Sequence, residues 1–286
     1  MSENVPVIIF GPGYTASRLA IRLISRNIPV FAAARETAKH ARLQAAGVVV
    51  MSLKQPKLPE NARIVYSIPP LSISEAQPIR RLVEQLTPGR LIYISSTSVY
   101  GNVSKVHENS PIDTETNRAR ARWDEESYFR SRPWSTLILR PAAIYGPWRG
   151  VHTRVQAGLV SRGASSLVTS RIHVDDLVQL IEAGLDRAPD GAYLEGAWPV
   201  ADEEPSPTAA IADWCARHFG VRLNTGSAPE NQESGRSVDG SAIFRTLGVK
   251  ILQPRWRTGI PACLAEEAQS LGCDRRGQQG GMSGSQ

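Results

Sequence analysis

The sequence predicts an α/β fold in which a doubly wound parallel sheet carries a smaller C-terminal lobe. Three observations lead to this prediction: a short apolar run that stops at a glycine turn, an amphipathic helix directly after the turn, and strands that alternate with helices further on. The chain has 286 residues, of which 41% are hydrophobic and 21% charged, so it is long and apolar enough to bury a large core.

The first strand is predicted at 5–10, where the apolar run is continuous, as in a parallel strand covered on both faces. The turn after it, at 11–16, reads GPGYTA. The following helix has apolar residues at helical spacing, namely Ala16, Leu19, Ala20, Leu23 and Ile24. This spacing places them on one face, which can pack against the sheet.

The alternation of strands and helices continues along the first half of the chain. Strands are predicted at 30–34, 48–51, 64–68, 91–95 and 136–139, and helices at 36–46, 75–86 and 117–129. Because parallel strands need a crossover connection, this order indicates a parallel sheet with helices on both faces. Beyond residue 150 the sequence is more mixed, with helices predicted at 174–185, 208–219 and 260–271.

The formal charge of +6 is spread over many short runs, with no block of five like charges. We therefore expect no nucleic-acid partner, and the arginines suit an anionic small ligand equally well. The cysteines Cys215, Cys263 and Cys273 form no C-x-x-C pair, so we expect no metal site and a reducing compartment. The first apolar run stops at Gly11, too early for a leader or a membrane segment, which predicts a cytoplasmic protein without a membrane partner.

The glycine turn predicts a dinucleotide site. Gly11 permits a tight turn, Gly13 lets the backbone N–H groups of Tyr14 and Thr15 approach a pyrophosphate, and the small Ala16 lets the helix pack close to the strand. Such a turn after a strand and before an amphipathic helix is typical of a Rossmann domain. A plain turn between a strand and a helix is the alternative interpretation.

The end of the second strand decides which dinucleotide is expected. An acid at this place binds the ribose 2′-hydroxyl of NAD, whereas a base accommodates the 2′-phosphate of NADP. This chain has Arg35 there and no carboxylate at the tip, which favours NADP, with NAD as the alternative. We divide the chain into an NAD(P)-binding Rossmann domain at 1–150, a smaller mixed substrate lobe at 151–273 and a disordered tail at 274–286.

Three further strings occur in order along the chain: SSTSVYG at 95–101, LRPAAIYGP at 139–147 and RIHVDDL at 171–177. Together with the glycine turn, they resemble the extended and atypical short-chain dehydrogenase/reductases, the NAD(P)-dependent epimerases and dehydratases of nucleotide sugars. The resemblance runs from about residue 5 to residue 268. It implies an enzyme with a bound nicotinamide cofactor, as a monomer or a homodimer.

The resemblance also implies roles for single residues. Ser96 matches the serine or threonine beside the nicotinamide, which hydrogen-bonds the reacting oxygen, and Ser95 precedes it. Ile68 and Pro69 match the loop after the fourth strand, which passes near the cofactor. The segment that begins with Arg140 and Pro141 matches the one that passes over the nicotinamide end.

The sequence departs from the family where a tyrosine, followed four residues later by a lysine, transfers the proton. The alignment puts Arg118 at the tyrosine position and Arg122 at the lysine position. Arg118 cannot release a proton at neutral pH, whereas Arg122 can still hold the cofactor ribose and supply positive charge. The alternative is an exposed helix in which Arg120 pairs with Asp124 and Arg122 pairs with Glu126.

Another group must then transfer the proton. Tyr145 is our candidate, because it follows the sixth strand at the carboxyl edge of the sheet. Ser96 with an ordered water and chemistry assisted by the substrate are the alternatives. Ser96 and the segment 144–147 favour an NAD(P)-dependent oxidoreductase or epimerase/dehydratase-like enzyme for a small substrate, for which a sugar is one candidate. The altered tyrosine and lysine favour a catalytically inactive NADP(H)-binding sensor or scaffold.

Overall fold

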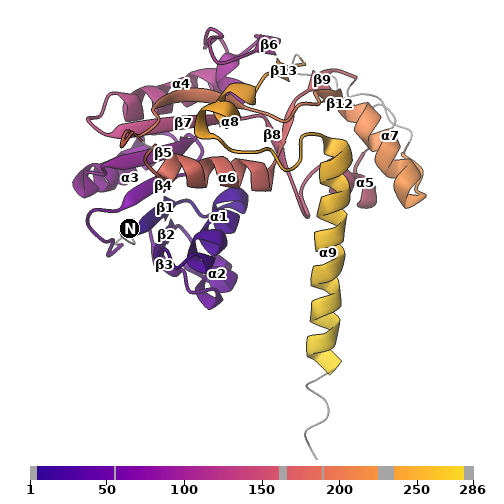
Figure 1. Cartoon of the computed structure of the whole chain (residues 1–286), viewed down its shortest axis with the longest axis horizontal. Coiled ribbons are helices and arrows are strands. Elements are labelled where there is room, and N and C mark those ends of the chain that lie inside the picture. The colour runs from indigo at the N-terminus through magenta and orange to yellow at the C-terminus, as the bar shows by residue number, and fades with distance from the viewer. Residues whose placement is uncertain (1–4, 55, 161–165, 189, 225–234, 280–286) are drawn as a thin grey trace, which may run out of the picture.

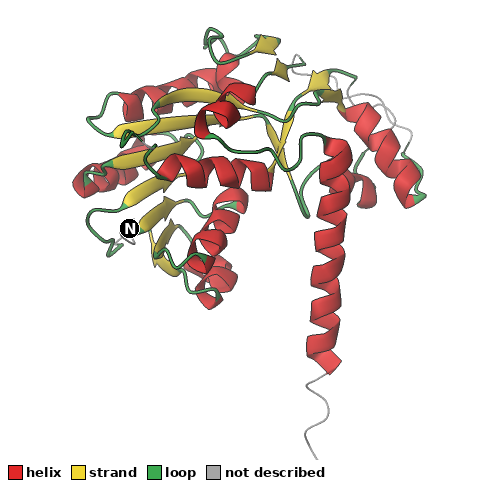
Figure 2. Cartoon of the chain, in the orientation of Figure 1, coloured by secondary structure: helices red, strands yellow, loops and turns green. Residues whose placement is uncertain are grey.

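The computed structural model describes residues 5–54, 56–160, 166–188, 190–224 and 235–279. A seven-stranded sheet forms its centre (Figure 1 and Figure 2). Its strands are β1 (Val7–Phe10), β2 (Val30–Ala34), β3 (Val49–Ser52), β4 (Arg63–Tyr66), β5 (Arg90–Ile94), β7 (Ser135–Pro141) and β11 (Gly196–Val200). They follow the order β11-β7-β5-β4-β1-β2-β3, and each neighbouring pair is parallel. This arrangement confirms the predicted doubly wound α/β fold.

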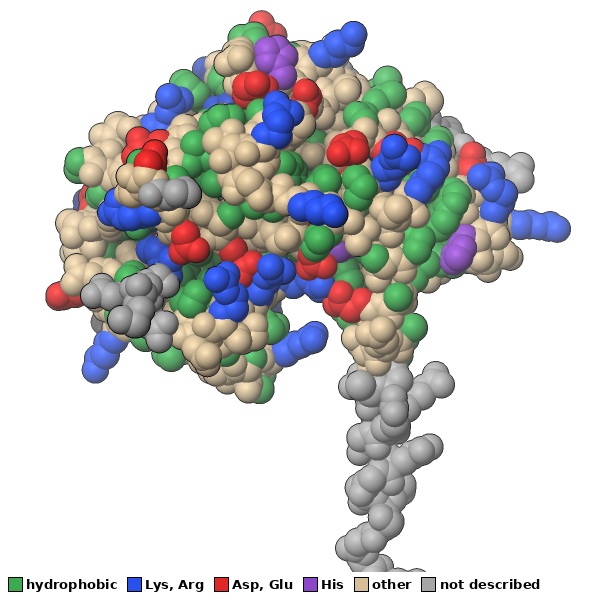
Figure 3. Space-filling view, in the orientation of Figure 1, with side chains coloured by type: hydrophobic (Ala, Val, Ile, Leu, Met, Phe, Trp, Pro, Cys, Tyr) green, Lys and Arg blue, Asp and Glu red, His purple; other side chains and the backbone are tan. Residues whose placement is uncertain are grey.

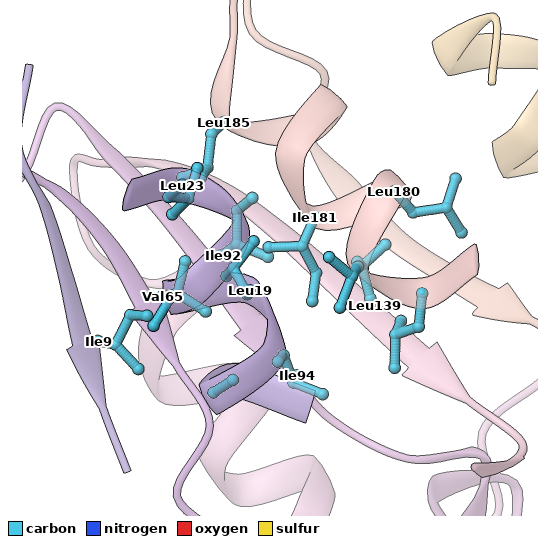
Figure 4. Close-up of a cluster of buried hydrophobic side chains, with 14 of the residues drawn as sticks. Ile9, Leu19, Leu23, Val65, Ile92, Ile94, Leu139, Leu180, Ile181 and Leu185 are labelled. Carbon is cyan, nitrogen blue, oxygen red and sulfur yellow. The ribbon is translucent and has the colours of Figure 1, made fainter. Parts of the chain in front are cut away.

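Helices cover both faces of the sheet. One face carries α1 (Tyr14–Ser25) and α6 (Val174–Leu185), and the other carries α3 (Ile73–Leu86) and α4 (Asn117–Arg130). Side chains alternate along each strand, so Ile9 of β1 lies in one core with residues of α1 and α6, while Phe10 lies in the other core, which includes Phe129 of α4. Figure 4 shows the first of these two cores, between the strands and α1 and α6.

Local signals explain where several helices begin and end. Helix α3 begins at a capping box of Ser72 and Glu75, in which the backbone N–H and the hydroxyl of Ser72 both donate to the carboxylate of Glu75. Helix α7 (Thr208–Phe219) ends at Gly220, which adopts a φ of 65° that suits glycine. The helix predicted at 36–46 is instead a short η1 (Thr37–His40) followed by α2 (Ala41–Ala45).

Several short strands lie beyond the carboxyl edge of the sheet. Three pairs of strands form there: β8 (Ala143–Tyr145) with β10 (Arg171–His173), β9 (Val168–Thr169) with β12 (Ser206–Pro207), and β6 (Lys105–Val106) with β13 (Ser237–Val238). The other elements are η2 (Thr97–Tyr100), α5 (Val151–Gln156), α8 (Ser241–Leu247) and α9 (Trp256–Gln279).

The predicted domain boundary at residue 150 needs correction. Strand β11 pairs with β7 and completes the sheet, and α6 covers one of its faces, although both come after residue 150. The reason is that the edge of β7 and the apolar face of the sheet require these later segments as partners. The smaller lobe is therefore built mainly from α5, α7 and the first turns of α9, which share an apolar cluster around Trp256.

Helix α9 extends from the smaller lobe and projects away from the rest of the molecule (Figure 1). It continues to Gln279, beyond residue 274, at which a disordered tail was expected to begin, because a nucleated helix adds further residues easily. Residues 280–286 of that expected tail lie outside the described residues.

The surface visible in Figure 3 carries lysine and arginine side chains that lie among acidic ones, so basic charge is not gathered on this face. Within the described part of the chain, no helix combines the length and the apolar character that crossing a membrane requires.

Candidate active site

The glycine turn lies where the strand order reverses, between β1 and β4. Gly11 follows β1 with a φ of 79°, and a Cβ at this position would lie 2.7 Å from Cγ1 of Ile68, which follows β4. Glycine is thus required at this position both by the backbone conformation and by the close contact. The structure therefore brings Gly11 and Ile68 together at the switch point, where ligands bind in open parallel sheets.

The N-terminus of α1 is open to an anion. Gly13 precedes the helix, no side chain caps the first turn, and the first turn contains no acidic residue. The N–H groups of Tyr14, Thr15 and Ala16 have no acceptor inside the helix. A Cβ at Gly13 would meet only the carbonyl oxygen of Gly11, at 4.0 Å. These features fit a pyrophosphate bound by backbone N–H groups.

The side chain of Tyr14 points away from this turn. Its hydroxyl donates a hydrogen bond to the carbonyl oxygen of Pro147 at 2.9 Å, and burial raises its pKa. A side chain at Gly146 would collide with this hydroxyl. Tyr14 therefore links α1 to the segment 146–149, and only its backbone faces the predicted cofactor site.

Arg35 lies directly after β2, at the same edge of the sheet as Gly11, and its side chain is exposed. Pro69 is also exposed, one residue beyond the buried Ile68. Both residues thus stand at the carboxyl edge beside the glycine turn, as the sequence predicts.

A cavity of about 490 Å³ lies beyond the carboxyl ends of β5 and β7. The residues that line it include Ser95, Ser96, Pro141, Arg118 and Arg122. Oγ of Ser96 accepts a hydrogen bond from the backbone N–H of Ser98 at 3.1 Å, so its own hydrogen is available to a ligand in the cavity. The structure thus brings together two of the three predicted catalytic residues, Ser96 and Arg122.

Arg122 is held by a buried phenol. Its Nη1 donates to the hydroxyl of Tyr93 at 3.1 Å, and burial raises the pKa of Tyr93 to about 12, so this phenol stays neutral at pH 7. The alternative in which Arg122 pairs with Glu126 is wrong, because Glu126 points into the protein and is 0% exposed. Arg122 therefore presents its charge to the cavity without a carboxylate from its own helix.

Glu126 is a residue that sequence reasoning missed. It accepts a hydrogen bond from Oγ of Ser95 at 2.6 Å and pairs with Nη2 of Arg140 at 2.6 Å, while Nη1 of Arg140 donates to the hydroxyl of Tyr100 at 3.0 Å. This buried network fixes α4 to the ends of β5 and β7. One signal was present in the sequence: Glu126 lies on the same face of the helix as the apolar Ala119 and Phe129.

The role implied for Arg140 needs correction. Its side chain is buried, its guanidinium is engaged by Glu126 and Tyr100, and it does not line the cavity. Arg140 supports the floor of the site through Glu126 and Ser95 and does not itself face the predicted nicotinamide position. Pro141, the next residue, does line the cavity.

No protein-family model and no curated protein matches the sequence. Solved structures match it over nearly the whole chain. One is a functionally unknown conserved protein from Silicibacter pomeroyi, with 25% identity, a TM-score of 0.77 and coverage of 92% of this chain and 99% of that chain.

Two further structures contain ligands. MoeE5 in complex with UDP-glucose and NAD has 18% identity and a TM-score of 0.75, with coverage of 93% of this chain and 99% of its own. UDP-glucuronic acid 4-epimerase from Bacillus cereus, in complex with UDP-glucuronic acid and NAD, has 15% identity, a TM-score of 0.75 and coverage of 93% and 99%. This chain shares the α/β fold of these structures.

Within this fold, Tyr145 does not reach the cavity beside Ser96. It lies on β8, where Ala143 and Ile144 line that cavity and the Tyr145 side chain points elsewhere. Its ring packs edge-on against His173 at 5.2 Å, and a side chain at Gly259 would collide with its hydroxyl.

Burial also raises the pKa of Tyr145, which keeps the phenol protonated. Tyr145 lines a separate cavity of about 460 Å³ that also includes His152 and Trp256. The prediction that Tyr145 replaces the missing tyrosine is therefore wrong for this conformation. Of the two side chains that the sequence offers for proton transfer, Tyr145 and Ser96, Ser96 is the one that lines the cavity beside Arg122.

Proposed function

We propose that this chain is an NAD(P)-dependent oxidoreductase or epimerase/dehydratase-like enzyme for a small substrate. The observation that carries the proposal is the arrangement at one edge of the sheet. Gly11 follows β1, Ile68 follows β4 and Ser96 follows β5, and these three strands are neighbours. A dinucleotide whose pyrophosphate lies on the glycine turn would extend along this edge toward the cavity at Ser96.

The residues present fit such a cofactor. The N–H groups at the start of α1 would bind the pyrophosphate, and the exposed Arg35 would bind the 2′-phosphate of NADP. Ile68 would pack beside the cofactor at the switch point. The nicotinamide supplies hydride transfer when it is bound.

The chain's own residues orient and polarise the substrate. The Ser96 hydroxyl, fixed by the N–H of Ser98, donates a hydrogen bond to the reacting oxygen. The guanidinium of Arg122, held by Tyr93, stabilises negative charge that develops on that oxygen. Arginine does not release its proton at neutral pH, so we assign proton transfer to the Ser96 hydroxyl and a water bound to it.

A second candidate function is an NADP(H)-binding sensor that does not turn over a substrate. Arg118 favours it, because this arginine stands at the tyrosine position of the family and lines the cavity. A crystal structure with NADP bound distinguishes the two functions. For an enzyme we expect C4 of the nicotinamide to face the cavity within reach of Ser96; only apolar groups around C4 would favour the sensor.

Fluorescence titration with NADPH and NADH tests the cofactor assignment. We expect NADPH to bind more tightly than NADH, and Arg35→Gln to weaken NADPH binding by about 10-fold, because one charge-assisted contact to phosphate is lost. NADH binding should not change. Arg42→Gln, at an exposed arginine of α2, is the matched control. Equal weak binding of both nucleotides, or none, contradicts the assignment.

A further inference from the structure

The second cavity, the one of about 460 Å³ that Tyr145 lines, is formed by residues of β8, α5, α7 and the start of α9. Much of its wall is aromatic or aliphatic, namely Tyr145, Trp148, Val151, Ile211, Trp256 and Ile260. Among the described residues no carboxylate lines it, whereas three arginines do: Arg149, Arg154 and Arg171. The second cavity adjoins the cavity beside Ser96, because the two share the lining residues Ala143, Ile144, Arg149 and Thr169.

Arg171, on β10, is the buried arginine of this wall and is 5% exposed. Its Nη1 donates to the carbonyl oxygens of Thr169 at 2.7 Å and Ser206 at 2.8 Å, and its Nη2 donates to Oγ1 of Thr208 at 2.9 Å. These are all the hydrogen bonds that Arg171 makes within the described residues. A guanidinium has five N–H groups, so the Nε–H and one Nη2–H of Arg171 have no acceptor there.

Two other buried arginines show that this pattern is not general in the protein. Nε of Arg90 donates to the carbonyl oxygen of Gly184 at 2.8 Å, and Nε of Arg140 donates to Glu126 at 3.0 Å. In both, the protein itself supplies an acceptor for the Nε–H. A buried donor without an acceptor is costly, so the free donors of Arg171 favour an acceptor that comes from a ligand in the second cavity.

The carboxyl group of Asp202 does not occupy these donors. Asp202 acts on Arg171 electrostatically, but no ion pair or hydrogen bond joins the two within the described part of the chain, and Asp202 does not line the second cavity. Burial raises the pKa of Asp202 to about 8, so this carboxyl is mostly protonated at pH 7. Burial lowers the pKa of Arg171, but a guanidinium stays protonated at neutral pH.

We propose that the second cavity binds an organic carboxylate with an aromatic or aliphatic body, and that Arg171 binds its carboxylate group. The two free donors of Arg171 match the two oxygens of a carboxylate, and Trp148 and Trp256 offer the body an apolar surface. A phosphate monoester brings a third oxygen, for which Arg171 has no further donor. The binding does not depend on the proposed function. That the carboxylate belongs to the substrate rests on that function and on the shared wall of the two cavities.

Calorimetric titration of the full chain tests this proposal with four probes: phenylacetate, 2-phenylethanol, acetate and phenyl phosphate. We expect phenylacetate to bind about 30-fold more tightly than 2-phenylethanol, because only phenylacetate makes the charge-assisted contact. It should also bind about 30-fold more tightly than acetate, which lacks an apolar body to bury. Phenylacetate that binds no more tightly than either of these two, or less tightly than phenyl phosphate, would overturn the proposal.

A substitution at Arg171 locates the carboxylate. Arg171→Lys keeps the positive charge but has no planar pair of donors, so it should reduce the preference for phenylacetate over 2-phenylethanol by about 10-fold. Arg90→Lys makes the same change at a buried arginine outside the second cavity and should leave the preference intact. An equal loss of preference in the two variants contradicts the assignment to Arg171.

A substitution at Trp148 tests the body of the ligand without disturbing the fold. Trp148 is 46% exposed and has a φ of 58°, a left-handed conformation that suits glycine, so Trp148→Gly should fold normally. It should weaken the binding of phenylacetate and 2-phenylethanol alike, by about 5-fold, because both lose apolar contact. Thr87→Gly, at an exposed residue with a φ of 40° after α3, is the control and should bind both like the wild-type protein. Unchanged binding in Trp148→Gly contradicts the proposed position of the body.

Titration with NADPH separates this inference from the proposed function. A protein that binds no nicotinamide nucleotide but prefers phenylacetate through Arg171 contradicts the proposed function and supports the carboxylate site. A protein that binds NADPH but shows no preference for phenylacetate contradicts only the carboxylate site.

Discussion

Gly13, directly before α1, has open space where a side chain would lie. A Cβ there would meet only one atom, the oxygen of Gly11 at 4.0 Å, so a larger side chain fits the folded chain. It would occupy the space that the proposed pyrophosphate needs. We therefore expect Gly13→Val to weaken NADPH binding by about 100-fold or more, which corresponds to about 2.7 kcal/mol, while the melting temperature changes little.

Gly89 provides the matched control for this experiment. A Cβ at Gly89 meets nothing within 4 Å, and the residue lies before β5 at the opposite end of that strand from Ser96. Gly89→Val should bind NADPH like the wild-type protein in a fluorescence titration. If Gly13→Val also binds NADPH normally, the cofactor does not lie on the glycine turn.

Helix α4 shows, at the scale of one element, which features a sequence predicts and which it does not. Its predicted bounds, 117–129, agree closely with the observed Asn117–Arg130, because helix length and caps are local properties. The partner of Glu126 is not local. Arg140 comes from β7, so the sequence offered the nearer Arg122 as partner, and the buried pair became visible only in the folded chain.

The Glu126 pair ties α4 to β7, and its loss should destabilise the whole fold. Glu126→Gln leaves the buried Arg140 without a charged partner, which we expect to lower the free energy of unfolding by about 3 kcal/mol. Urea denaturation measures the effect. Glu115→Gln, at an exposed carboxylate just before the same helix, is the control and should change stability by less than about 0.5 kcal/mol. Equal effects of the two variants contradict a structural role for the pair.

The short strand β8 explains the one wrong catalytic prediction. Tyr145 was placed at the correct edge of the sheet, because it follows the long strand β7. The position of its side chain depends on contacts with residues far along the chain, from β10 and α9. Ala143 and Ile144 line the cavity beside Ser96, whereas the Tyr145 ring packs against His173 and the first turns of α9.

At the scale of the whole molecule, the alternation of strands and helices was sufficient to predict the parallel sheet and the helices on both faces. Every strand that was predicted in the first half was found within a few residues of its predicted position, whereas the two-residue β6 was not predicted. The boundary at residue 150 was wrong for a physical reason: β11 joins the sheet from a segment about 55 residues beyond β7, and short-range patterns do not report pairing over that distance.

The stability of the whole molecule should depend on a buried carboxyl, Asp202, which lies just after β11. Burial raises the pKa of Asp202 to about 8, against the opposing effect of the nearby Arg171 charge. The unfolded chain releases this proton near pH 4, so between about pH 4 and pH 8 the folded state binds more protons. The free energy of unfolding therefore falls as the pH rises through this window, by at most about 1.4 kcal/mol per pH unit.

Asp202→Asn removes the titrating group and should flatten this dependence. Urea denaturation at several pH values between about 5 and 8 measures the slope for both proteins. Asp124→Asn, at an exposed carboxylate of α4, should retain the slope of the wild-type protein. A slope that is unchanged in Asp202→Asn shows that Asp202 is already ionised in this range.

The hydrogen bond from Tyr14 to Pro147 has a consequence for how the two halves of the site communicate. Tyr14 begins the helix whose N-terminus faces the proposed cofactor, and Pro147 belongs to the segment that carries Arg149 to the cavity wall. We therefore expect a nucleotide bound at the start of α1 to restrain that wall as well. A substrate that binds second should then lose less conformational entropy, so we expect the two ligands to favour each other's binding without a change of shape.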